Sequence, residues 1–189
     1  MRVAAILEAA AAVIDEKGYE GATMAEIAAR SATKIGSLYR FFPNKESLAD
    51  TLLVNARENL EAVFERFDAD VSGLSIRGLT DDLMALIFGL FATPAFMKLL
   101  DAGQEWSIKR EEFKSAMQQR VAKTLMIHSP NLSKKSAGDI ALIVMLNVKA
   151  VATHQAFSVT TSTVPEEFRD MTRLYLQSRL RSGKKSIPR

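Results

Sequence analysis

The 189-residue chain contains no cysteine. This absence excludes disulfide frameworks, zinc–thiolate sites, iron–sulfur clusters and thiol nucleophiles, and it is typical of a protein from a reducing compartment. Long hydrophobic runs are also lacking, since the longest, such as 83–92, span about ten residues against the roughly 20 that a membrane helix needs. Acidic residues at 8, 15 and 16 interrupt the N-terminal segment, so it does not have the pattern of a signal peptide. We therefore expect a cytoplasmic protein with no membrane partner.

Catalytic and metal-binding patterns are missing as well. There is no Ser/His/Asp arrangement, HExxH motif or glycine-rich phosphate loop. The two histidines, His128 and His154, have no carboxylate at metal-ligand spacing beside them. We expect neither an enzyme nor a bound metal or cofactor.

The overall composition is that of a folded soluble protein. Apolar residues make up 48% of the chain and charged residues 25%, which is enough for a substantial core. The 25 basic and 22 acidic residues leave a net charge of only +3. That balance by itself neither requires nor excludes a nucleic-acid partner.

Apolar residues recur at helical spacing almost throughout, and no sustained stretch alternates as a strand would. Glycine 18 stands where a helix stop belongs, and Ser/Thr with Asp/Glu three residues later forms capping boxes at 23, 136 and 163. We expect helices at about 3–17, from 23, and at 34–42, 45–67, 79–92, 95–103, 107–128, 136–157 and 164–182, with a linker at 71–78. The sequence thus predicts an all-α protein of about nine helices, a small three-helix N-terminal unit before a larger helical body.

Charge is segregated within the N-terminal unit. Residues 1–26 hold two basic and five acidic side chains, whereas residues 27–45 hold four basic side chains and no acidic one. A surface that faces phosphates needs positive charge without neighbouring acids, which would be repelled by the DNA backbone. An ordinary solvated face is the alternative interpretation of the same run.

The second and third predicted helices have the spacing of a helix-turn-helix, in which the second helix enters the major groove. Leu38 and Phe42, four residues apart, would face the core and leave the other side of that helix outward. Gly36 has no side chain, which permits close approach to a base pair. The outward residues are Lys34, Ile35, Ser37 and Arg40, with the Tyr39 hydroxyl and the Lys45 ammonium available to phosphates.

The same region carries a specific pattern: ILEAA at 6–10, GYEGAT at 18–23, TMAEIA at 23–28 and GSLYRFFPNKESL at 36–48. It resembles the TetR family of bacterial transcriptional regulators over about residues 2–53. The resemblance implies a DNA-binding domain at 1–50, a ligand-binding and dimerisation domain at 51–189, and a homodimer on a near-palindromic double-stranded operator.

By position, the resemblance implies phosphate contacts from Thr23, Tyr39 and Lys45 and base contacts from the start of the third helix. The residues expected at the DNA are Thr23, Thr33, Lys34, Ile35, Gly36, Ser37, Tyr39, Arg40 and Lys45. The chain departs from the family at the turn, where Ser31-Ala32-Thr33-Lys34 replaces the usual Ala-Gly-Val-Ser. It departs again at Phe41, where a tyrosine or histidine often contacts a phosphate.

The larger body is unusually apolar, which is more often simple core than a binding site. A polar group in an apolar cavity, such as Asn147 or His154, would orient a ligand. We expect a small, largely apolar inducer, with candidate contacts from Leu86, Leu90, Phe91, Trp106, Phe113, Met117, Asn147 and His154.

The dimer interface is expected within residues 136–182. Phe168, Met171 and Tyr175 form part of an apolar stripe that either packs inward or, as in the family, is shared between subunits. Val144 and Val151 on the preceding predicted helix complete the set of expected interface residues.

Two functions remain open from the sequence. The first is a DNA-binding transcription regulator, as a repressor released from its operator by the inducer. The alternative is an α-helical carrier or sequestering protein for an apolar metabolite, without specific DNA binding. Specific operator binding would discriminate between them.

Overall fold

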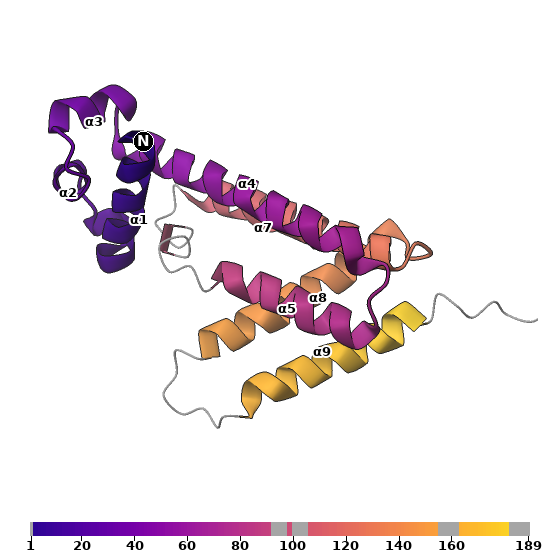
Figure 1. Ribbon diagram of the computed structural model, residues 1–189. Coiled ribbons are helices and arrows are strands. Elements are labelled where there is room, and N and C mark those ends of the chain that lie inside the picture. The colour runs from indigo at the N-terminus through magenta and orange to yellow at the C-terminus, as the bar shows by residue number, and fades with distance from the viewer. Residues whose placement is uncertain (1, 92–97, 100–105, 155–162, 182–189) are drawn as a thin grey trace, which may run out of the picture. The chain divides into compact units, whose positions relative to one another are not determined.

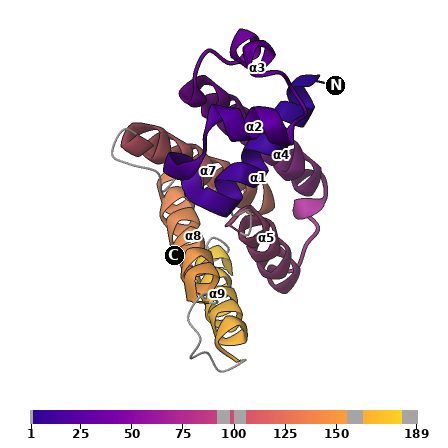
Figure 2. The same ribbon diagram turned by 90° about the vertical axis from the view of Figure 1, so that its left-hand side faces the viewer.

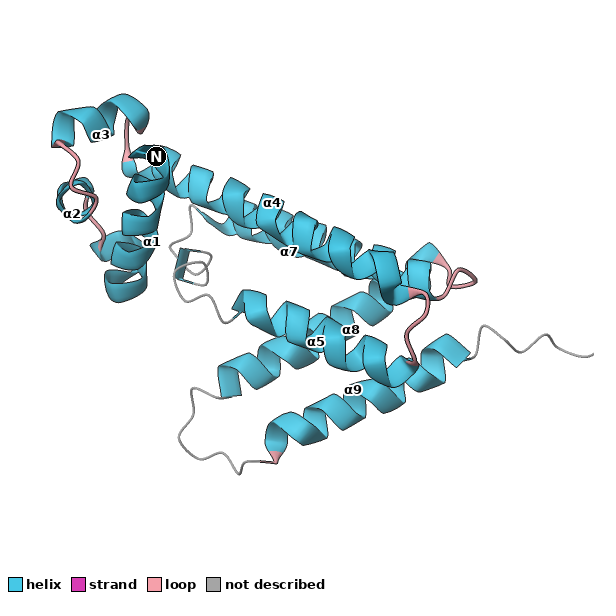
Figure 3. Cartoon of the chain, in the orientation of Figure 1, coloured by secondary structure: helices cyan, strands magenta, loops and turns pink. Residues whose placement is uncertain are grey.

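The structure, a computed structural model, describes residues 2–91, 98–99, 106–154 and 163–181. Within these ranges there are eight helices and no strand (Figures 1 and 3), so the expected all-α fold is confirmed. The helix predicted at 95–103 lies mostly outside the described residues. The helices are α1 (Arg2–Gly21), α2 (Met24–Arg30), α3 (Ile35–Phe41), α4 (Lys45–Val71), α5 (Ile76–Phe91), α7 (Ser107–His128), α8 (Lys134–His154) and α9 (Val164–Arg181).

The chain divides into two compact units. One comprises Met1–Leu60 and Thr93–Glu112, and the other comprises Glu61–Ala92 and Phe113–Arg189. The first unit therefore includes a segment from the middle of the chain. The functional boundary expected at residue 50 stays a prediction.

The N-terminal unit is held by a core of aliphatic side chains. α2 packs against both α1 and α3 (Figure 2). The apolar residues of each helix meet in the centre because they repeat at helical spacing. Ile6, Ile14, Ile27, Leu38 and Leu48 are all completely or almost completely buried there.

Several predicted helix ends are confirmed. Gly18 adopts a φ of +75°, which turns the chain after the long part of α1. Asn44 caps α4, since its Oδ1 accepts from the N–H of Ser47 at 2.7 Å.

Other predicted ends need correction. α5 begins at Ile76 because Ser75 Oγ accepts from the N–H of Gly78 at 3.1 Å, so the linker is shorter than 71–78. α8 begins at Lys134, not at 136, because Ser133 Oγ accepts from the N–H of Ser136. Ser136 is therefore inside the helix rather than its cap.

In the second unit α5, α8 and α9 pack against one another (Figure 1). Their contact is apolar, with Leu83, Ile87, Ile140, Val144 and Leu176 all fully buried. This three-helix contact positions the cavity described below.

None of the helices within the described ranges is both long enough and apolar enough to cross a membrane.

Candidate nucleic-acid interface

The start of α2 is fixed by the predicted capping box. Thr23 Oγ1 accepts from the N–H of Glu26 at 3.2 Å, and the Thr23 hydroxyl donates to Glu26 Oε2 at 2.9 Å. The ammonium of Lys17 also pairs with the Glu26 carboxylate. This hydrogen bond from Lys17, with that from Thr23, lowers the pKa of Glu26. The predicted DNA contact Thr23 is thus held rigidly at an exposed helix N-terminus.

The turn between α2 and α3 retains the geometry that glycine normally supplies. The N–H of Thr33 bonds to the carbonyl of Ala28 at 2.9 Å, and that of Ala32 to the carbonyl of Ala29 at 3.2 Å. This is a Schellman motif, which places the residue after the C-cap in the left-handed region. Ala32 occupies that position with a φ of +50°. The departure at Ala32 therefore strains the turn without changing its path.

Helix α3 buries Leu38, half-buries Ser37 and exposes its other residues. Leu38 is fully buried, whereas Ile35 is 44% and Tyr39 48% exposed. Lys34 and Arg40 are exposed too, and neither forms an ion pair within the part of the chain that the structure describes. The exposed surface of α3 is therefore both apolar and cationic, a combination that suits contact with base edges and phosphates.

Gly36 shows that the start of α3 is open. A Cβ added at this glycine would meet no atom of the chain within 4 Å. Packing within the chain therefore gives no reason for a glycine at position 36.

Two other residues expected at the DNA are less exposed. Ser37 is half-buried, and Thr33 donates its hydroxyl to the carbonyl of Ser31 at 3.2 Å.

Two of the four basic residues in 27–45 bind other groups of this chain. Arg30 pairs with Glu16, and this hydrogen bond lowers the pKa of the Glu16 carboxyl. The ammonium of Lys45 donates to the carbonyl oxygens of Tyr19 at 2.7 Å and Glu20 at 3.2 Å. It also lies 4.4 Å from the centre of the Tyr19 ring.

The contacts of Lys45 explain its place at the start of α4. A lysine there opposes the helix dipole, so a compensating partner is needed. The structure supplies an internal partner, since the carbonyls at the end of α1 accept from this ammonium. A DNA contact by Lys45 stays a prediction that its position no longer requires.

A second aromatic contact closes the N-terminal unit. Trp106 is 2% exposed and packs edge-on against Tyr19, with ring centres 4.9 Å apart. The ammonium of Lys109 lies 4.5 Å from the Trp106 ring centre and pairs with Asp50 and Glu46. Burial opposes the charge of Lys109, but these two carboxylates outweigh it and raise the pKa. Trp106, expected at a ligand, is buried in this core, and a ligand contact stays a prediction.

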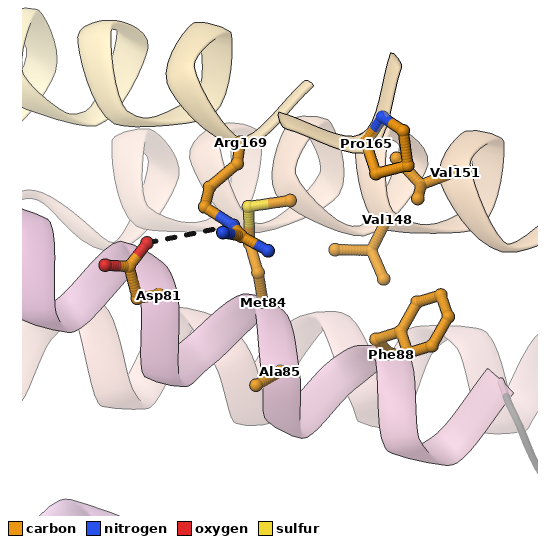
Figure 4. A pocket seen from close by; sticks show the side chains of 8 residues that line it. All are labelled: Asp81, Met84, Ala85, Phe88, Val148, Val151, Pro165 and Arg169. Carbon is orange, nitrogen blue, oxygen red and sulfur yellow. Dashed lines mark ion pairs between the residues drawn. The ribbon is translucent and has the colours of Figure 1, made fainter. Parts of the chain in front are cut away.

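The second unit contains a cavity of about 230 Å³ between α5, α8 and α9 (Figure 4). Its described walls are mostly apolar. Among the lining residues that the structure describes, the charged ones are Asp81 and Arg169, whose Oδ1 and Nε atoms lie 3.9 Å apart. The described lining residues are Asp81, Met84, Ala85, Phe88, Val148, Val151, Pro165 and Arg169.

Of the residues expected at a ligand, none whose side chain is described lines this cavity, and their contact with a ligand stays a prediction. Met117 is buried in the core, and Asn147 donates to Thr172 Oγ1 at 3.2 Å. Leu86 and Phe113 are only half-buried. The side chains of Leu90, Phe91 and His154 lie outside the described residues. The sequence signal for this cavity was the helical spacing of residues 81, 84, 85 and 88, which places them along one side of α5. The apolar residues 83 and 87 hid this signal because they dominate the apolar pattern of the helix.

The expected dimer residues divide into two groups. Val144 and Val151 are 0% and 6% exposed, Val144 in the core and Val151 at the cavity, so one chain by itself already covers most of their surface. Phe168 and Tyr175 are half-buried, and Met171 is 48% exposed. The sequence analysis missed the exposed apolar residues Leu142, Ile143, Leu146 and Leu174.

Metal ligands are not gathered anywhere in the described part of the chain. No group of three or more His, Cys, Asp or Glu side chains there could hold a metal ion. His128 contacts the Leu74 carbonyl through Nε2 at 3.0 Å and the Ser129 hydroxyl through Nδ1 at 2.9 Å.

Residues 6–52 match the family model described as bacterial regulatory proteins, tetR family. The chain is 39% identical over 75 residues to the HTH-type transcriptional repressor KstR of Mycolicibacterium smegmatis, covering 40% of this chain and 33% of that protein. The match thus spans about a third of that relative's length.

Solved structures share the whole fold. A TetR-family transcriptional regulator from Streptomyces coelicolor superposes with a TM-score of 0.64 at 24% identity, over 95% of this chain and 100% of that one. The regulator FadR from Bacillus subtilis, in complex with stearoyl-CoA, superposes with a TM-score of 0.61 at 18% identity, over 96% and 99%. At these identities the likeness shows the fold alone.

Proposed function

Since its N-terminal domain belongs to the tetR family of bacterial regulatory proteins, we propose that this protein is a sequence-specific transcriptional regulator that represses from a double-stranded operator. The family model covers residues 6–52, which include both helices of the helix-turn-helix and the turn between them. The repressor KstR, to which this region is similar, supports repression as the direction of control.

One observation carries the proposal, namely the exposed surface of α3. Ile35, Tyr39 and Arg40 are solvent-exposed on a seven-residue helix that has no acidic side chain, and the exposed cation Lys34 directly precedes that helix as its N-cap residue. A solvated helix would not need two large apolar groups there, whereas base edges and the thymine methyl offer them contact.

The first experiment is selection of genomic DNA fragments by the purified protein, followed by titration of the best fragment across salt. We expect a near-palindromic site whose affinity falls steeply as salt rises, because cations on the protein displace counterions from phosphates. Weak binding without sequence preference would contradict the proposal and favour the carrier function.

We also propose that the protein acts as a homodimer through α8 and α9. Leu142, Ile143 and Leu146 on α8 and Met171 and Leu174 on α9 are 38% to 62% exposed, which is unusual for a cluster of large apolar residues. Light scattering should give twice the monomer mass at micromolar concentration. Leu174→Glu should lower it to the monomer mass, while Ile108→Glu, at an apolar residue that is 71% exposed elsewhere, should not.

A small, largely apolar ligand is proposed to release the protein from its operator. Ligand binding would favour a spacing between the two α3 helices that no longer fits half-sites about 34–36 Å apart. A near-complete switch requires about 5 kcal/mol of preference for the released state. Compounds that raise the melting temperature should also dissociate the operator complex, and stabilising compounds that leave the complex intact would contradict this mechanism.

A further inference from the structure

The cavity between α5, α8 and α9 is amphipathic in a specific way (Figure 4). Phe88, Val148 and Val151 form part of an apolar wall, and the described charges stand together at Asp81 and Arg169. An apolar site with a few convergent polar groups is the usual form of a small-molecule site, because the wall provides affinity and the polar group provides orientation.

The guanidinium of Arg169 is only loosely held. Its Nε lies 3.9 Å from Asp81 Oδ1, at the outer limit of an ion pair, and its side chain is 55% exposed. Asp81 is also shared, because Arg77 Nε lies 3.8 Å from its other oxygen. One carboxylate thus faces two guanidinium groups, and each of them carries five N–H donors. This local excess of positive charge favours the binding of an additional anion over that of an additional cation.

The geometry of guanidinium and the size of the cavity restrict the ligand further. A guanidinium donates two parallel hydrogen bonds to a carboxylate, an arrangement that a lone hydroxyl cannot match. The volume of about 230 Å³ is below the roughly 300 Å³ at which sites for drug-sized ligands begin. A short apolar chain fits such a space.

We propose that this cavity binds a small amphipathic monocarboxylate, whose chain packs on the apolar wall and whose carboxylate accepts hydrogen bonds from Arg169. This inference rests on the proposed function, because it names the chemical class of the effector that the regulator senses. It assigns opposite effects to the two charged residues: Arg169 attracts the ligand, and Asp81 competes with it for the same guanidinium.

The test measures binding of octanoate, with octanol and octylamine as probes of equal chain length, by calorimetry on the full-length protein. We expect octanoate to bind at least about tenfold more tightly than octanol, since only the acid makes charge-assisted hydrogen bonds. Equal binding of the acid and the alcohol, or tighter binding of the amine, would overturn the proposal.

Two variants separate a ligand role from a structural one. Arg169→Gln should weaken octanoate binding by about tenfold or more, whereas Asp81→Asn should strengthen it several-fold, because a competing negative charge is removed. If the pair only held α5 to α9, both variants would act in the same direction, and that result would refute the assignment. Arg173→Gln, one turn further along α9 and paired with Asp170, is the matched control that should leave binding unchanged.

The location of the site is tested by filling it. Ala85 lines the cavity and is exposed, so Ala85→Phe should block octanoate without disturbing the core. Unchanged octanoate binding in this variant would place the ligand elsewhere and overturn the proposal. Operator binding is measured on the same samples, so that intact DNA binding without octanoate binding refutes only the ligand class, whereas absent DNA binding refutes the proposed function.

Discussion

Arg120 on α7 and Asp68 on α4 form a buried ion pair, with Nη2 and Oδ2 2.7 Å apart and side chains only 6% and 12% exposed. Thr124 donates its hydroxyl to the other oxygen of Asp68 at 2.7 Å, and the guanidinium lies 4.7 Å from the Phe64 ring centre. Arg120 Nε is 3.0 Å from Glu61 Oε1 without hydrogen-bond geometry. This cluster joins the later part of α4 to α7.

Removing one partner of this pair should strongly destabilise the protein. We expect Asp68→Ala to lower the free energy of unfolding by about 3 kcal/mol, because it removes the carboxylate that is hydrogen-bonded to the buried guanidinium of Arg120 and leaves only the half-exposed Glu61 beside it. Urea unfolding followed by circular dichroism, at fixed protein concentration, measures this. Asp70→Ala, at an exposed position on the same helix, should change it by less than about 0.5 kcal/mol. Equal effects of the two variants would show that the pair is unimportant.

The strained turn predicts a stabilising substitution. Ala32→Gly should raise the free energy of unfolding by about 0.5 to 1 kcal/mol, because glycine adopts a φ of +50° without the side-chain penalty. Ala29→Gly, three residues earlier in α2, should lower it by a similar amount, since glycine is unfavourable inside a helix. Urea unfolding should therefore give shifts of opposite sign, and a loss of stability in both variants would contradict a strained Ala32.

Gly36 should separate stability from DNA binding. Gly36→Ala is expected to stabilise the fold by about 0.5 to 1 kcal/mol, since the added methyl group meets nothing in the chain. The same methyl group should weaken operator binding about tenfold if α3 lies close to the bases. Gly89→Ala in α5 also adds a methyl group into open space, so it should match the stability gain without affecting DNA. Unchanged operator affinity in Gly36→Ala would argue against close approach at this residue.

Arg40 should contribute to DNA binding, whereas Lys45 should contribute to the stability of the fold. Arg40→Ala should leave the melting temperature unchanged and reduce the slope of log affinity against log salt by about 0.9, the value for one lost phosphate contact. Lys45→Ala should lower the free energy of unfolding by about 1 kcal/mol, because its ammonium holds two carbonyls and stacks on Tyr19. Fluorescence anisotropy with labelled operator gives the slopes. An unchanged slope in Arg40→Ala would remove this residue from the DNA surface.

The lowered pKa of Glu26 predicts that this residue accounts for part of the loss of stability at low pH. Its pKa is lowered below the ordinary 4.5 by the hydrogen bonds from Lys17 and Thr23. The stabilisation is therefore present above the unfolded-state pKa and is lost as the pH falls through the lowered value. Melting temperatures from about pH 6 to about pH 3 should fall less steeply for Glu26→Gln and for Lys17→Met than for the wild type. Identical profiles in all three proteins would contradict this role.

Local chemistry made much of the N-terminal unit predictable. The capping box at Thr23, the turn at Gly18 and the buried Leu38 depend on residues within a few positions of one another. A helix forms its backbone hydrogen bonds within its own segment, so its position and its apolar face are encoded locally. For the same reason, the exposed face of α3 could be predicted from spacing alone.

Packing between residues far apart in the sequence determined the features that local sequence could not predict. Lys45 meets carbonyls about 25 residues earlier in the chain, and Trp106 packs on Tyr19 across a still larger separation. The cavity forms only where α5, α8 and α9 converge, and there the apolar residues 83 and 87 turn to the core while Asp81 and Phe88 line the space. An apolar pattern shows that a face is buried but not which partner covers it, because that depends on how helices distant in sequence pack together.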